Sequence, residues 1–146
     1  MRSAGKILLM SLCTLTLLLG TSALHPQHKT ADLKVIMNQL MMDMFTVNQG
    51  IWQEDFSLIA QGANDIVHHP KIPRGQKQRI SEILGNDMAR FARYDKQVHN
   101  HADSLKQAAK EHSMDRVLKE YRTVQNGCVG CHTAFREPLQ NAGYTQ

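Results

Sequence analysis

The stretch GCVGCHTAFR, which runs from Gly127 to Arg136, places two cysteines three residues apart with a histidine directly after the second. Residues at positions i, i+3 and i+4 share one face of a helix. Cys128, Cys131 and His132 would therefore emerge from the same side of a helix in this stretch. Only one further cysteine, Cys13, occurs in the chain, so the sulfur chemistry of the protein centres on this stretch.

The spacing of apolar side chains predicts a helix from about residue 114 to residue 136, and Pro138 is expected to end it. The apolar positions repeat at intervals of four and three residues: Val117, Tyr121, Val124, Cys128, Cys131 and Phe135. Because this stripe runs through both cysteines, their thiols would face the interior of the domain and not its surface.

Cys-x-x-Cys-His is the attachment signature of c-type haem. Cys128 and Cys131 would form two thioether bonds to one covalent haem c, and His132 would bind the iron. Three alternatives are weaker. A redox-active disulfide of this spacing occurs beside a βαβ pattern, which the sequence lacks. A zinc site wants four ligands, and no second ligand pair of matching spacing is present. A plain disulfide from i to i+3 is awkward within a helix.

Helical spacing recurs in three further segments, over about residues 30–48, 51–68 and 94–112. Four helices with short connections predict an all-α fold, an antiparallel four-helix bundle with haem in its core. The region 71–93 also has helical character, and it is either a short extra helix or an N-terminal extension of the third helix. Gly85 and Asn86 favour a break there.

The inward faces of the first two helices follow from the same spacing. The first stripe holds Leu33, Met37, Leu40, Met44 and Val47, widened by Ile36 and Met41, and the second holds Trp52, Phe56, Ile59, Ala63 and Ile66. Methionine fills irregular core gaps well, so most methionines here are expected to be core or surface residues and not ligands.

The remaining histidines are weak candidates for a second iron ligand. His68 and His69 precede Pro70 and are expected to end a helix in solvent. His99 and His101 are two residues apart and would point away from each other on a helix. His25 and His28 lie in the first residues after the apolar N-terminal run.

The N-terminal residues have the layout of a secretory signal: a basic start with Arg2 and Lys6, an apolar run and the small residues Thr21 to Ala23. We expect cleavage after Ala23, a haem domain over residues 24–146, no membrane span after cleavage, and a periplasmic location. A retained anchor is the alternative, although the apolar run is short for a spanning helix. Removing Arg2 and Lys6 lowers the net charge from +4 to +2, which gives no reason to expect nucleic-acid binding.

With these residues in hand, the sequence resembles the cytochrome c′ and cytochrome c-556 family. The resemblance rests on a secreted chain of this size, four predicted helices, and a haem motif close to the C-terminus that ends in CHTAFR. It implies haem between the helices of a four-helix bundle, with His132 as the fifth ligand and Arg136 beside the haem. It also implies that a residue of the first helix covers the opposite side of the haem, and Met37 matches that position best.

This distal residue separates two functions within the family. A methionine that binds iron is typical of the c-556-like members, so Met37 implies an electron transfer protein that works with unidentified redox partner proteins. If Met37 only packs over the haem, the resemblance implies a five-coordinate protein that binds nitric oxide or carbon monoxide. The arginine that many cytochromes c′ carry in the first helix is missing here.

An enzyme is not expected, because peroxidase chemistry needs a distal base and a polar group near the iron. The inward stripe of the first helix supplies neither. Relatives often dimerise through their first two helices, so a homodimer is a further expectation from the resemblance.

Overall fold

The computed structural model describes residues 32–143. The expected signal peptide and its cleavage after Ala23 lie outside the described residues, as do His25 and His28. Within residues 32–143, no helix is long and apolar enough to span a membrane.

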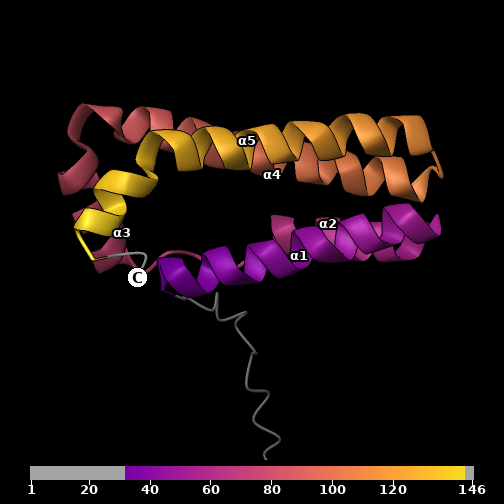
Figure 1. Ribbon diagram of the computed structural model, residues 1–146, viewed down its shortest axis with the longest axis horizontal. Helices are drawn as coiled ribbons and strands as arrows, with labels where there is room; N and C mark the ends of the chain where they lie inside the picture. Colours follow the sequence, from indigo (N-terminus) through magenta and orange to yellow (C-terminus); the bar gives the residue numbers. More distant parts are fainter. Residues whose placement is uncertain (1–31, 144–146) are drawn as a thin grey trace, which may run out of the picture.

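The described chain folds into a helical bundle (Figure 1). Its elements are α1 (Leu33–Gln53), α2 (Phe56–Val67), α3 (Arg74–Leu84), the 3₁₀ turn η1 (Gly85–Asp87), α4 (Met88–Lys110) and α5 (Met114–Asn141). Two antiparallel pairs, α1 with α2 and α4 with α5, lie one over the other, and α2 packs against α4. Helix α3 lies at one end of the bundle. The predicted all-α four-helix bundle is therefore confirmed.

The break between the first two helices lies further along the chain than the sequence predicts. Helix α1 continues to Gln53, and Glu54 adopts the left-handed conformation with φ of 53°. The Asp55 side chain then accepts a hydrogen bond from the Leu58 amide at 3.0 Å, which caps the start of α2. Trp52 consequently belongs to α1, and it is 73% exposed. Its predicted place on the inward stripe of the second helix is wrong.

Both alternatives for the region 71–93 occur together. Helix α3 is the short extra helix, and Met88 to Arg93 extend the third predicted helix at its N-terminus. The break falls at Gly85, as predicted, where φ is +50°. Residues that carry a side chain rarely adopt this backbone conformation, so the turn favours a glycine.

The sequence predicts that the last helix ends before Pro138, and this prediction is wrong. The helix continues to Asn141 with Pro138 inside it, and it bends near its C-terminal end (Figure 1). Proline removes one backbone hydrogen bond and kinks a helix. The next residue, Leu139, is only 4% exposed and packs with Leu33, Ile80 and Phe135. Burial of the apolar Leu139 side chain stabilises this last turn of the helix.

Two apolar clusters hold the bundle together. The larger joins residues of all four main helices, among them Val47, Ile66, Leu105 and Val124. The smaller lies at the α3 end and contains Leu33, Ile80, Phe135 and Leu139. Cys128 packs against the first cluster and Cys131 against the second, so the predicted haem motif lies at the boundary between them.

Helix α1 also has an apolar outer face. Its large exposed side chains are Val35 (57%), Met41 (62%), Met42 (53%), Phe45 (55%) and Trp52 (73%). The prediction that Met41 widens the buried stripe of the first helix is therefore wrong. Several exposed apolar side chains on one helix are unusual for a surface that only faces water.

The contact between α1 and α2 depends on a glycine, which gives a test of the packing. A Cβ atom on Gly62 would lie 2.8 Å from both the Asp43 carbonyl oxygen and Val47 Cγ2. We expect Gly62→Ala to lower the free energy of unfolding by about 1–3 kcal/mol, because the helices would have to separate. Urea denaturation followed by circular dichroism measures this change.

Gly75→Ala is the matched control, since a Cβ atom at that helical position meets nothing within 4 Å. It should be neutral or stabilising by up to about 1 kcal/mol. Equal losses for the two variants would contradict the close packing at Gly62.

Candidate functional site

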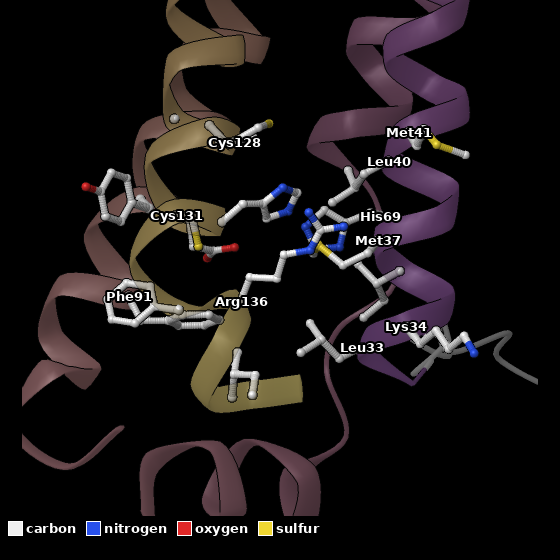
Figure 2. A pocket seen from close by; sticks show the side chains of 18 of the residues that line it. Leu33, Lys34, Met37, Leu40, Met41, His69, Phe91, Cys128, Cys131 and Arg136 are labelled. Atoms are coloured by element: carbon white, nitrogen blue, oxygen red, sulfur yellow. The ribbon is translucent and has the colours of Figure 1, made fainter. Parts of the chain in front are cut away.

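A cavity of about 430 Å³ lies between α1 on one side and α4 and α5 on the other. Its walls are largely apolar, and they include Leu33, Met37, Leu40, Met44, Phe91, Tyr94, Val98 and Leu139. Figure 2 shows this space from close by, with Cys128, Cys131 and Arg136 on the α5 side and Met37 and Leu40 on the α1 side. Cys128, Cys131 and Arg136 therefore lie opposite Met37, and the fifth predicted site residue, His132, also lines the cavity.

Two glycines beside the cysteines explain the direction of the thiols. A Cβ atom on Gly127 would lie 2.8 Å from Val98 Cγ2, and one on Gly130 would lie 2.7 Å from Tyr94 Cε1. These glycines therefore let α5 approach α4 closely. Cys128 and Cys131 each follow one of them, about 100° further round the helix, and both line the cavity.

Both thiols are half-buried and free of any disulfide. Burial raises the pKa of Cys128, and burial, Cys128 and Asp95 raise that of Cys131 to about 11. Reactive cysteines have depressed pKa values, because the thiolate is their nucleophile. Burial thus disfavours the thiolate form on which a redox-active or nucleophilic pair depends.

His132 and Arg136 lie one helical turn apart on α5, and both line the cavity. Burial, followed by the charge of Arg136, lowers the pKa of His132. The imidazole is therefore neutral near pH 7, which is the form that binds a metal ion. The Arg136 side chain extends across the cavity toward α1 (Figure 2).

Met37 is half-buried in the α1 wall, one turn from Leu33 and Leu40. Leu33 is only 3% exposed and belongs to the smaller apolar cluster. Met41 lies on the same helix at the rim, mostly exposed to solvent. Met37 and Met44 are thus the half-buried thioethers of this wall, and Met37 is the one that the sequence predicts to face the haem.

Sequence reasoning did not place His69 or Asp95 in the cavity wall. His69 is half-buried, Asp95 of α4 is exposed, and both line the cavity. The expectation that His68 and His69 both end a helix in solvent is right for His68, which is exposed at the end of α2. It is wrong for His69, whose ring packs against His99 with centroids 4.8 Å apart. No local pattern links residues so far apart in the chain.

A family model described as Cytochrome C′ matches residues 37–136, which include Met37, both cysteines, His132 and Arg136. The chain belongs to the cytochrome c′ family. Neither a curated protein nor a solved structure matches the chain significantly. The matched segment covers most of the helical bundle, from α1 to the Cys-x-x-Cys-His motif on α5.

The family implies haem c, and the chemistry of this site fits that group. A cytochrome c′ domain needs two thiols and one imidazole on a shared helix face beside an apolar space, and Cys128, Cys131 and His132 provide them around the cavity. Proteins of this family are in general electron carriers or gas-binding haem proteins and not enzymes.

The thioether assignment can be tested by removing both thiols. We expect Cys128→Ala combined with Cys131→Ala to abolish covalent haem, because no described cysteine would remain beside the cavity. The measurement is haem staining of the denatured protein after electrophoresis. Val129→Ala, an exposed position between the two cysteines, should keep its haem. Haem that stays attached in the double variant would refute the assignment.

Proposed function

We propose that this cytochrome c′ family member is an electron transfer protein in which His132 and Met37 would bind the haem iron. The observation that supports it most is Met37 in the α1 wall of the cavity, with the haem motif in the α5 wall. A thioether ligand raises the reduction potential of a haem. Bound haem supplies an iron centre that alternates between the ferric and ferrous states.

The protein around this site would contribute insulation and orientation. The apolar side chains of the cavity exclude water, and exclusion of water strengthens the effect of each nearby charge. Arg136 is the cationic side chain that reaches into the cavity from α5. It would pair with the carboxylate groups of the cofactor, because a guanidinium binds carboxylates in a planar, two-pronged geometry.

The alternative is a gas-binding cytochrome c′ that carries, senses or scavenges nitric oxide or carbon monoxide. The observation in its favour is that Leu33 and Leu40 flank Met37 in the same wall. If Met37 packs over the haem without binding iron, these side chains make an apolar distal pocket. Such an apolar pocket suits neutral diatomic ligands.

Absorption spectroscopy of the purified holoprotein decides between the two functions. For the electron carrier we expect low-spin ferric and ferrous spectra that carbon monoxide does not change. Met37→Ala should convert these to high-spin spectra that shift when carbon monoxide is added, because the sixth position opens. A wild-type protein that is already high-spin and binds the gas would exclude Met37 ligation and establish the alternative.

Met42→Ala is the matched control, because Met42 lies on the same helix but is 53% exposed and does not line the cavity. Its spectra should equal those of the wild type. A change of equal size in both variants would mean that the spectra report general damage to α1.

The location and partners of the protein belong to the same proposal. Export through the N-terminal signal would deliver the chain to the periplasm, the compartment typical of this family. Its redox partners are other proteins, and the small net charge predicted for the mature chain gives them little electrostatic steering.

We infer that a second copy of the chain covers the outer face of α1. Val35, Met42, Phe45 and Trp52 are all more than half exposed and follow intervals of seven, three and seven residues. This is the spacing of a helix–helix seam. Dimers formed through the first two helices also occur among the relatives that the sequence resembles.

Sedimentation velocity tests the dimer. Phe45→Glu with Trp52→Glu should give a monomer where the wild type sediments as a dimer, because two charges would be buried in the seam. Leu118→Glu, at an exposed position of α5, is the control and should stay dimeric. A monomeric wild type would exclude this interface.

A further inference from the structure

Three side chains that bind metals in other proteins meet beside the cavity. His69 follows α2, and Asp95 and His99 lie one turn apart on α4. One potential ligand atom from each of them lies within 4.8 Å of the others. The shortest separation joins the two Nε2 atoms of His69 and His99, at 3.1 Å. Asp95 Oδ1 lies 3.8 Å from the same His99 nitrogen.

The backbone sets the tautomer of His69. Its Nδ1 lies 2.8 Å from the Pro70 carbonyl oxygen, and a carbonyl oxygen only accepts hydrogen bonds. Nδ1 therefore carries a proton, and in the neutral tautomer Nε2 directs its lone pair toward His99. A histidine whose second nitrogen donates to a carbonyl is the arrangement typical of metal-binding imidazoles.

The His99 ring has two ways to complete this contact. Without a metal ion, a proton on Nε2 of the neutral ring would donate to His69 Nε2. The His99 ring also has a hydrogen-bond partner in the backbone of Val67. With the proton on Nδ1 instead, two lone pairs would face each other, and only a cation between them makes that arrangement favourable.

The separation of the two nitrogens suits one metal ion. Zinc binds imidazole nitrogen at about 2.0–2.1 Å. Two such nitrogens lie about 2.9 Å apart at a right angle and about 3.4 Å apart at the tetrahedral angle, from the same bond length. The observed 3.1 Å falls between these values. The site thus needs little rearrangement of the two rings.

Asp95 completes the donor set. Its side chain is 60% exposed, so it is free to change rotamer and shorten the 3.8 Å gap. Burial lowers the pKa of His99, which favours the neutral ring that metal binding requires. Two imidazoles and one carboxylate with a position left for water are a recurrent set for zinc.

We propose that His69, His99 and Asp95 bind one divalent transition metal ion of the zinc type at the edge of the cavity. The ion would join the segment after α2 to α4, two elements that the chain separates by a whole additional helix, α3. Binding moves the proton of His99 from Nε2 to Nδ1, on the side of its Val67 backbone partner, so both rings bind the ion in their neutral form. This site is additional to the haem iron and does not depend on which function of the haem is right.

Zinc binding to the holoprotein tests the site directly. We expect isothermal titration, after treatment with a chelator, to show one zinc ion per chain. His99→Gln and Asp95→Asn should each weaken zinc binding by at least about 10-fold, since even an indirect partner of a ligand is worth that much. Equilibrium dialysis with zinc analysis gives the stoichiometry independently of heat.

Neighbouring histidines supply the matched controls. His68 bonds the Asn64 carbonyl oxygen, and His101 bonds Glu120 on α5, so His68→Gln and His101→Gln should bind zinc as the wild type does. Circular dichroism and haem content establish that each variant is folded. Asp95→Asn, at an exposed position, keeps the test valid if a histidine variant fails to fold.

Three results would overturn the proposal. The first is a wild type that binds no zinc, and the second is equal binding by the wild type, His99→Gln and Asp95→Asn. The third is a low-spin to high-spin change in the zinc-free spectrum of His69→Ala that is absent from His99→Gln. That last result would assign His69 to the haem iron.

Discussion

The close approach of α5 to α4 at two glycines is the constraint on which the site depends. Gly127 and Gly130 bring the two helices so near that a Cβ atom at either position would clash with Val98 or Tyr94. The cysteines that follow them are turned away from this contact and into the cavity. Helix packing and the predicted haem-attachment motif therefore share one short segment, and the same rotation of α5 orients both.

Helix α1 lies opposite this segment and meets α5 on either side of the cavity. Toward one end, the Tyr121 hydroxyl donates to Asn48 Oδ1 at 3.3 Å. Toward the other, Leu33 packs with Phe135 and Leu139 in the smaller apolar cluster. The bend at Pro138 carries Leu139 into that cluster. The cavity thus lies between these two contacts of α1 with α5, and α3 lies at the end of the bundle next to the second contact.

Burial is the common physical cause of the chemistry at this site. It raises the pKa of both thiols and lowers the pKa of His132 and His99, because a low-dielectric surrounding disfavours every charged form. The two cysteines stay protonated and the two imidazoles stay neutral. Neutral imidazoles are the form that binds a metal, whether that metal is haem iron or the ion proposed beside the cavity.

Much of this protein was determined by local sequence pattern alone. Helical spacing predicted the four-helix bundle, and the Cys-x-x-Cys-His motif predicted Cys128, Cys131 and His132 as haem-binding residues, since both patterns are properties of neighbouring residues on one helix. The tertiary structure decided what depends on distant segments. Trp52 is exposed because the turn after α1 falls at Glu54. Helix α5 continues past Pro138 because Leu139 then packs in the smaller apolar cluster. His69 lies close to Asp95 and His99 because α2 packs on α4. The spacing of residues within one helix does not specify which residues of two different helices contact each other.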